Sequence, residues 1–169
     1  GTLEKHEPSR GRMRLLSGIK QTTIIDDSYN SSPVALQAAL ETLRGIEAKG
    51  RKIAVLGDML ELGLYSTDEH KKAGVEASKV ADLLFTVGIR ARMIAEGAQD
   101  GGMDESRIFQ YEDSRTAGKD LEIMIREGDV ILVKGSQGIR MEKVVEEIFV
   151  DPLHADQFLV RQDAEWEGR

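Results

Sequence analysis

Cysteine is absent from the sequence. Disulfide bridges, thiolate metal sites and cysteine nucleophiles are therefore excluded. Long apolar runs are absent as well: none approaches the roughly 20 residues of a membrane-spanning helix, and the N-terminal residues do not have the apolar core of a signal peptide. We therefore expect a cytoplasmic protein with no membrane as a partner.

A basic surface is also lacking. The 169 residues include 23 Lys and Arg against 30 Asp and Glu, and the formal net charge is -7. Because nucleic acids and anionic membranes attract basic proteins, a nucleic-acid partner is not expected. With 40% hydrophobic residues and a length within the range of one domain, the chain can bury a core of its own.

The order of the apolar segments predicts the fold class. Short segments with the composition of buried strands alternate with segments that have helical periodicity. The predicted strands are residues 13–16, 22–25, 53–56, 83–87, 108–111 and 130–133. The first two are expected to form a hairpin that turns around Ser17–Gly18. The sequence therefore predicts an α/β fold with a mostly parallel sheet of about six strands, an antiparallel edge and helices on both faces.

Two helices have recognisable end signals. Residues 31–33 (SSP) combine a capping serine with a first-turn proline, which predicts a helix start, and Gly50 is expected to follow the last turn of that helix. Residues 66–69 (STDE) have the pattern of a capping box and predict a second helix through about Val80.

Polar residues follow several predicted strands. In open parallel sheets the active groups lie just past the carboxyl ends of strands. That rule selects four segments, residues 26–32, 57–63, 88–90 and 134–140. We expect the functional groups of this domain to lie in these segments.

Residues 26–33 (DDSYNSSP) form the first candidate site. A carboxylate between a strand and a helix can accept hydrogen bonds from both hydroxyls of a ribose, and the N-terminus of the helix favours an anion. The alternative interpretation is an ordinary turn that caps the helix. The residues of this segment do not decide between the two.

Residues 57–63 (GDMLELG) form the second candidate site. Its two glycines permit tight turns and a close approach of the backbone to a ligand. Asp58 and Glu61 have the charge to bind an ammonium group. In the alternative interpretation Asp58 caps a turn, while Met59 and Leu62 cover the core.

Residues 134–142 (KGSQGIRME) form the third candidate site. This segment combines a hydroxyl, two cations and backbone amides beside a helix start, which suits a carboxylate or a phosphate. It is not a P-loop, and the sequence contains neither that motif nor the G-x-G-x-x-G pattern of dinucleotide-binding domains. A standard NAD site is therefore not expected.

The sequence contains three histidines, and no two of them have the spacing of metal ligands. We therefore expect no metal site built by this chain alone. His70 lies in the predicted helix after the second candidate site. A single histidine in a helix is more often structural or solvated than functional, and the sequence alone leaves both alternatives for His70 open.

Taken together, the three candidate segments resemble those of a known family in their residues, their order and their separation along the chain. Asp-Asp-Ser-Tyr-Asn-x-x-Pro at 26–33, Val-Leu-Gly-Asp-Met-Leu-Glu-Leu-Gly at 55–63 and Val-Lys-Gly-Ser-x-Gly-x-Arg-Met-Glu at 133–142 resemble the C-terminal domain of the Mur ligases. They are most similar to the MurF type, which adds D-alanyl-D-alanine to UDP-N-acetylmuramoyl-tripeptide. The resemblance covers about residues 10–149.

The resemblance implies a Rossmann-like domain of an ATP-dependent ligase with three domains. In such enzymes the precursor carboxylate attacks ATP to form an acyl phosphate, and the amino group of the dipeptide then displaces phosphate. ATP and Mg²⁺ are held chiefly by the central domain, which carries the P-loop. We therefore expect this chain to contain no catalytic residue, to be inactive alone, and to act as a monomer together with the central and N-terminal domains of the same enzyme.

The resemblance also implies two groups of binding residues. The residues expected to contact ATP are Arg12, Asp27, Tyr29 and Asn30. The residues expected to contact the dipeptide are Asp58, Met59, Glu61, Lys134, Ser136 and Arg140. Within the second group, charge complementarity suggests Asp58 for the ammonium group, and Lys134, Ser136 or Arg140 for the carboxylate.

The expected organisation is a linker over residues 1–11, the ligase domain over residues 12–150 and a C-terminal extension over residues 151–169, for which partial packing is expected. Two alternatives to the proposed identity remain at this point. One is a stand-alone binding module with this fold and no chemistry, and the other is a related Mur-type ligase with a different acceptor.

Overall fold

The computed structural model of the chain describes residues 11–151. Its strands are β1 (Arg14–Gly18), β2 (Thr22–Asp27), β3 (Lys52–Gly57), β4 (Leu83–Val87), β5 (Ile108–Tyr111) and β6 (Val130–Lys134). Its α-helices are α1 (Pro33–Gly45), α2 (Ser66–Ser78), α3 (Arg92–Asp100), α4 (Ser114–Met124) and α5 (Glu142–Ile148). The expected packing of the C-terminal extension lies outside the described residues.

The six strands form one sheet in the order β1-β2-β6-β3-β4-β5. The β1–β2 pair is antiparallel, and every other neighbouring pair is parallel. The expected α/β fold, with a mostly parallel sheet and an antiparallel edge, is therefore confirmed. None of the helices within residues 11–151 has both the length and the apolar character needed to cross a bilayer.

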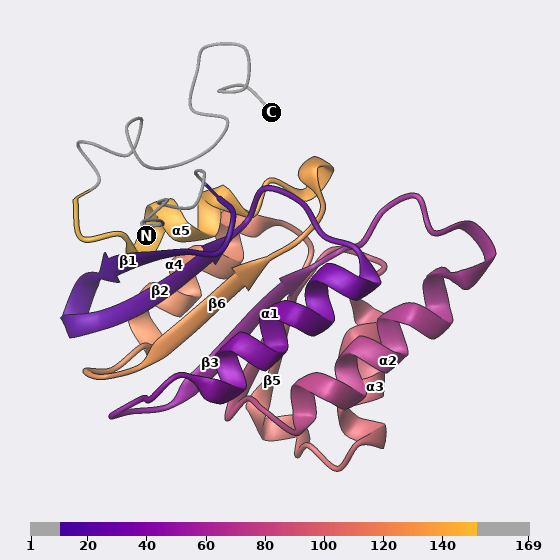
Figure 1. The fold of residues 1–169 in the computed structure, drawn as a ribbon, viewed down its shortest axis with the longest axis horizontal. Coiled ribbons are helices and arrows are strands. Elements are labelled where there is room, and N and C mark those ends of the chain that lie inside the picture. The colour runs from indigo at the N-terminus through magenta and orange to yellow at the C-terminus, as the bar shows by residue number, and fades with distance from the viewer. Residues whose placement is uncertain (1–10, 152–169) are drawn as a thin grey trace, which may run out of the picture.

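Helices cover both faces of the sheet. Helices α1, α2 and α3 pack on one face (Figure 1). Ile25, Leu84 and Leu132 of the strands belong to the same buried cluster as the apolar residues of these helices. Helices α4 and α5 pack on the other face. Since successive strand residues point to opposite faces and both faces are covered, residues 53–56 of β3 and residues 130–133 of β6 are continuously apolar rather than alternating.

Helix α1 begins as the sequence predicts. The Ser32 hydroxyl accepts a hydrogen bond from the Ala35 N–H, and Pro33 is the first helical residue. The expected end at Gly50 is wrong, because the helix stops at Gly45 and Ile46 is extended. Gly50 instead donates its N–H to the carbonyl of Gly128, 3.0 Å away, and so ties this connection to the start of β6.

The turn of the β1–β2 hairpin differs from the prediction. Strand β1 continues through Gly18, and the chain reverses over a short 3-10 turn, Ile19–Gln21. Lys20 has a left-handed backbone, with φ of 56°, which is strained for a residue with a side chain. Its ammonium group compensates by donating to the carbonyls of Glu122 and Ile125 at the C-terminal end of α4.

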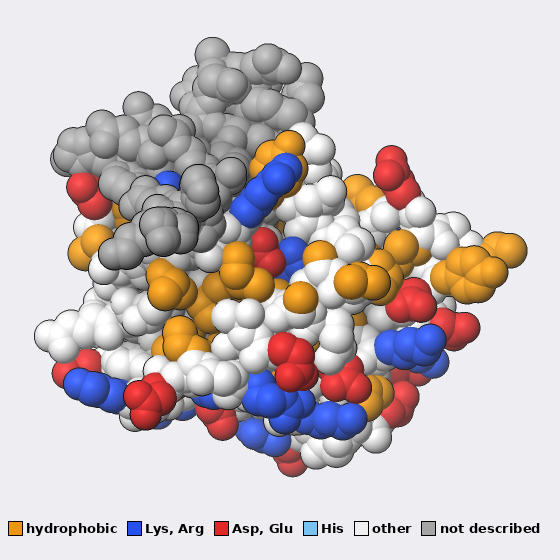
Figure 2. Space-filling model, viewed as in Figure 1, with side chains coloured by type: hydrophobic (Ala, Val, Ile, Leu, Met, Phe, Trp, Pro, Cys, Tyr) orange, Lys and Arg blue, Asp and Glu red, His pale blue; other side chains and the backbone are white. Residues whose placement is uncertain are grey.

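The capping box predicted for α2 is also not formed. Ser66 is the first residue of α2 rather than its cap, and no side chain caps this helix. The residues on either side of the preceding 3-10 turn (Gly63–Tyr65), Leu62 and Ser66, have right-handed helical backbone angles, and the turn leads directly into α2. This turn carries Leu64 and Tyr65, which are 98% and 71% exposed. Figure 2 shows an apolar protrusion at the corresponding end of the molecule.

Two glycines allow α2 and α3 to pack in direct backbone contact. A Cβ atom at Gly74 would lie 2.0 Å from the carbonyl oxygen of Ile94, and one at Gly97 would lie 2.1 Å from the carbonyl oxygen of Lys71. Both distances are far below van der Waals contact, and the obstacle is backbone rather than a flexible side chain. The two helices must therefore separate if either glycine is replaced.

We predict that Gly74→Ala lowers the free energy of unfolding by about 2–4 kcal/mol, because the added methyl group forces this helix pair apart. Gly45→Ala is the matched control, since Gly45 is also helical and has no atom within 4 Å of the added Cβ. That substitution is expected to stabilise by about 0.5–1 kcal/mol. Urea unfolding of both variants measures the difference, and equal effects would contradict this packing.

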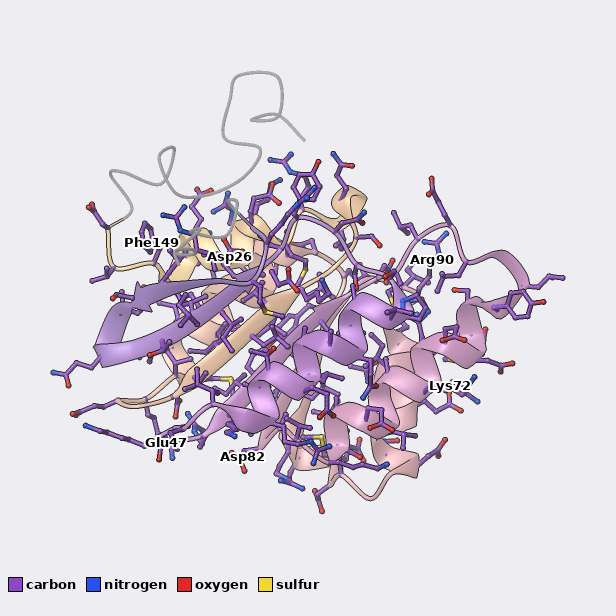
Figure 3. All side chains as sticks on the ribbon, viewed as in Figure 1. Asp26, Glu47, Lys72, Asp82, Arg90 and Phe149 are labelled. Carbon is purple, nitrogen blue, oxygen red and sulfur yellow. The ribbon has the colours of Figure 1, made fainter. Side chains whose placement is uncertain are left out.

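Asp26 is a buried carboxylate within β2 (Figure 3). One of its oxygens accepts hydrogen bonds from the N–H and hydroxyl of Ser28. The other is buried and has no hydrogen-bond partner among residues 11–151. Burial raises the pKa of Asp26 to about 6, and the neighbouring carboxylates of Asp27 and Glu142 add to the rise, while the bonds from Ser28 oppose it.

A raised pKa means that the folded protein holds this proton more tightly than the unfolded chain does. The charged form therefore destabilises the fold, and the cost grows as the pH rises from about 4 through about 6. Asp26→Asn keeps the acceptor for Ser28 and removes the charge. We predict that this variant gains about 2–3 kcal/mol relative to the unchanged protein between pH 4 and pH 8. Urea unfolding across this range measures the gain, and a pH-independent difference would contradict the burial of a titrating Asp26.

Candidate functional site

Three loops meet at the carboxyl edge of the sheet. They are residues 28–32 after β2, residues 58–62 after β3 and residues 135–141 after β6. Since β2, β6 and β3 are neighbours in that order, the three loops lie side by side. Each loop overlaps one of the segments that the strand-end rule selected. Arg90, from the fourth segment, lies at this end of the molecule, whereas Glu47 and Asp82 lie at the opposite end (Figure 3).

A cavity of about 780 Å³ lies between these loops, and we call it the three-loop cavity. Its lining residues are Asn30, Ser31, Ser32, Leu60, Glu61, Leu62, Ser136, Gln137, Gly138 and Arg140. Every one of the three loops contributes to it. Its volume is within the range of small-molecule sites.

A second cavity of about 420 Å³ lies beside β2 and the start of α1, and we call it the β2–α1 cavity. Its lining residues are Arg12, Met13, Asp27, Tyr29, Asn30, Ser31, Ser32, Ala35, Ala38 and Lys134. Residues 30–32 line both cavities. This short segment is therefore a shared wall between the two.

The β2–α1 cavity contains a buried ion pair. The Lys134 ammonium group donates to Asp27 Oδ2 at 2.8 Å and to the carbonyl of Asn30 at 2.9 Å. Asp27 Oδ1 accepts from the Met13 N–H at 3.0 Å. The side chains of Lys134 and Asp27 are only 4% and 13% exposed. Lys134 was expected to contact the dipeptide, but it lines the β2–α1 cavity together with the residues expected to contact ATP. It does not line the three-loop cavity, which contains Glu61 and Arg140.

Arg12 and Tyr29 both line the β2–α1 cavity. The Arg12 guanidinium lies over the Tyr29 ring, 4.1 Å from its centroid, at the distance of a cation–π contact. The Tyr29 N–H donates to the carbonyl of Gly11 at 2.7 Å, which ties the entry of the chain to the loop after β2. All four residues expected to contact ATP are thus brought together, although they come from both sides of the β1–β2 hairpin.

Glu61 and Arg140 line the three-loop cavity and carry opposite charges. Both have left-handed backbones, with φ of 64° and 58°. Such strain at residues other than glycine is concentrated at functional sites. Arg140 is 7% exposed, and its Nε donates to the buried carboxylate of Glu142.

Asp58 and Met59 line neither cavity. Asp58 is 4% exposed, and its Oδ1 accepts from the Ala91 N–H at 2.7 Å, at the residue preceding α3. Its Oδ2 lies 3.5 Å from Nη1 of Arg90. Met59 is completely buried in the core under α2 and α3. Asp58 and Met59 therefore have the structural roles of the alternative interpretation, in which Asp58 caps a turn and Met59 covers the core. Glu61 is the acidic residue of the second candidate segment that lines the three-loop cavity.

Several lining residues of the three-loop cavity were not expected from the sequence. These residues are Leu60, Leu62, Gln137 and Gly138. They carry no charge, so their position after the end of a strand was the only signal in the sequence that they could line a site. Within the described residues no group of three or more His, Cys, Asp or Glu side chains is arranged to hold a metal ion.

Residues 11–137 match the family model described as Mur ligase, glutamate ligase domain. The UDP-N-acetylmuramoyl-tripeptide–D-alanyl-D-alanine ligase of Bacillus subtilis (strain 168) is 36% identical over 148 residues, which cover 84% of this chain and 31% of the relative. The chain thus spans about a third of the length of the curated relatives that it matches.

Solved structures agree with these matches. The MurF ligase of Thermotoga maritima in complex with ADP superposes with a TM-score of 0.70 at 29% identity, over 90% of this chain and 33% of that one. A MurF structure from Acinetobacter baumannii gives a TM-score of 0.74 at 27% identity, over 85% of this chain and 31% of that one. Together with the three motifs, these matches show that the chain belongs to the Mur ligase family, as a C-terminal domain of the MurF type.

Proposed function

We propose that the chain is the acceptor-binding domain of an ATP-dependent ligase that joins D-alanyl-D-alanine to UDP-N-acetylmuramoyl-tripeptide through an acyl phosphate. The observation that carries this proposal is the three-loop cavity, which is lined by all three motifs and has Glu61 and Arg140 in its wall. A dipeptide is a zwitterion, and Glu61 and Arg140 have charges of opposite sign, with the Arg140 guanidinium also donating to the buried carboxylate of Glu142. The curated relatives, whose name is UDP-N-acetylmuramoyl-tripeptide–D-alanyl-D-alanine ligase, support the same assignment.

The chain is proposed to be the C-terminal third of such an enzyme. The domain would comprise residues 12–150, preceded by a linker at residues 1–11 and followed by an extension at residues 151–169. Phosphoryl transfer depends chiefly on a phosphate-binding loop and on metal ions. The sequence contains no P-loop motif, and residues 11–151 contain no group of three or more His, Cys, Asp or Glu that could hold a metal ion. The precursor, Mg²⁺ and most contacts with ATP would therefore belong to the central and N-terminal domains.

The β2–α1 cavity is proposed to form one wall of the ATP site. Arg12 and Lys134 provide positive charge for a nucleotide, and Asn30 and Tyr29 provide polar and aromatic surface. Asp27 is the proposed acceptor for the ribose hydroxyls, in addition to its bond from Lys134. The likeness to a MurF structure that contains ADP supports the use of a nucleotide by the enzyme.

The three-loop cavity is proposed to hold the dipeptide between Arg140 and Glu61. A guanidinium recognises a carboxylate through a planar pair of hydrogen bonds, so Arg140 is assigned to the dipeptide carboxylate. Glu61 is assigned to the ammonium end. It replaces Asp58 in this proposal because the Asp58 carboxylate is buried against Ala91.

A ligation assay tests the function itself. The intact parent enzyme, supplied with ATP, Mg²⁺ and UDP-N-acetylmuramoyl-tripeptide, should release phosphate in the presence of D-alanyl-D-alanine and produce the pentapeptide. The isolated 169-residue chain should do neither. Turnover with a single amino acid such as L-glutamate, and none with the dipeptide, would instead identify a related ligase with a different acceptor.

Replacement of Asp27 tests the nucleotide wall. In the intact enzyme we expect Asp27→Asn to lower kcat/KM for ATP by about tenfold or more, because a carboxylate that binds hydroxyls and an ammonium group is replaced by a neutral amide. Glu112→Gln is the control, since it removes the same charge from an 83% exposed side chain. An Asp27→Asn enzyme with the unchanged kcat/KM would exclude Asp27 from the ATP site.

Replacement of Arg140 tests the dipeptide assignment. Arg140→Lys keeps the charge and loses the planar pair of donors, so we expect KM for D-alanyl-D-alanine to rise about tenfold while KM for ATP stays unchanged. With D-alanyl-D-alanine amide, which has no carboxylate, the variant and the unchanged enzyme should have the same KM. A similar increase in KM with both acceptors would show that Arg140 does not bind the carboxylate.

A further inference from the structure

His70 is completely buried in α2, and the reaction described above makes no use of it. Its ring lies between two backbone groups. Nδ1 is 2.6 Å from the carbonyl oxygen of Ser66, and Nε2 is 3.0 Å from the backbone nitrogen of Met59. A second contact of Nδ1, with the Ser66 hydroxyl, is longer at 3.4 Å.

These two partners determine the protonation of the ring. A carbonyl oxygen can only accept, so Nδ1 must carry a proton and donate it to Ser66. A backbone N–H can only donate, so Nε2 must be unprotonated and accept from Met59. His70 is therefore the neutral Nδ1–H tautomer. In an imidazolium the Nε2–H would face the Met59 N–H, so that two donors would point at each other.

The bond to Met59 is one of three successive backbone bonds that hold the loop after β3. The Asp58 N–H donates to the carbonyl of Val87 at 3.1 Å, and the Met59 N–H donates to His70. The Leu60 N–H then donates to the Ser136 hydroxyl at 2.8 Å. These acceptors belong to β4, to α2 and to the loop after β6, so the loop is fixed from three sides just before Glu61.

The loop that is held in this way forms one wall of the three-loop cavity. Leu60, Glu61 and Leu62 line that cavity directly after the bonded residues. The Ser136 N–H also donates to the carbonyl of Asp58 at 2.8 Å, which joins this loop to the loop after β6. A change in the position of Met59 would therefore move the residues that face the ligand.

We propose that His70 is a positioning residue for the acceptor site. It does not touch the ligand, and it acts by accepting the Met59 N–H, which holds residues 60–62 in the wall of the three-loop cavity. Its loss leaves a buried N–H without a partner, and the loop must rearrange to satisfy that group. The effect on ligation rests on the proposed function, whereas the effect on the loop does not.

Two variants that remain polar separate positioning from general stability. His70→Gln keeps an acceptor at the reach of Nε2. His70→Asn keeps a polar group near Nδ1 and is too short to reach Met59. In the intact ligase we expect His70→Asn to raise KM for D-alanyl-D-alanine about tenfold with KM for ATP unchanged, and His70→Gln to restore most of the loss. Parallel increases in both KM values, no rescue by His70→Gln, or no effect of His70→Asn would each overturn the proposal.

Nuclear magnetic resonance of the 169-residue chain gives a test that needs no ligase activity. The imidazole ¹⁵N spectrum of the unchanged protein at neutral pH should show the Nδ1–H tautomer, and an Nε2–H tautomer or an imidazolium would overturn the proposal. Amide exchange of Met59 and Leu60 should accelerate in His70→Asn and not in His70→Gln, with Ile131 in β6 as the internal reference. If the intact enzyme fails to use D-alanyl-D-alanine, the proposed function fails while these spectra still decide the role of His70.

Discussion

The buried ion pair between Asp27 and Lys134 is the interaction on which the site depends. It joins the first motif to the third across neighbouring strands, and the second bond of Lys134, to the Asn30 carbonyl, fixes the wall between the two cavities. A buried charge that loses its partner is strongly destabilising. Either residue is therefore needed to keep the other in place, and with it the shape of both cavities.

The shared wall brings the two proposed ligands together. Residues 30–32 face the β2–α1 cavity on one side and the three-loop cavity on the other. In the proposed reaction the amino group of the acceptor must reach a carboxyl group activated by ATP, so the two sites must adjoin. Reacting groups held close together in this way gain much of their rate from proximity. This domain would thus position the dipeptide beside the nucleotide, while the groups that catalyse phosphoryl transfer would belong to the other domains.

The sequence was a good guide to strands and a poorer guide to side chains. The bounds of β4 and β5 agree with the prediction, because a charged residue or a glycine stands directly before and after each of these apolar segments. The β1–β2 turn was not predictable, because the bonds that stabilise left-handed Lys20 come from carbonyls about a hundred residues away. In the second motif, Asp58 and Glu61 have the same chemistry, and only the fold shows that one caps α3 and the other faces the cavity.

The proposed site of the acceptor dipeptide lies between the three loops. Titration of the ¹⁵N-labelled chain with D-alanyl-D-alanine shows where the dipeptide binds, because each backbone amide reports on its own surroundings. We expect saturable shifts at Leu60, Glu61, Gln137 and Gly138, and none at Lys119 in α4 on the other face of the sheet. Shifts confined to residues outside the three loops, or no shifts at millimolar dipeptide, would contradict the proposed site.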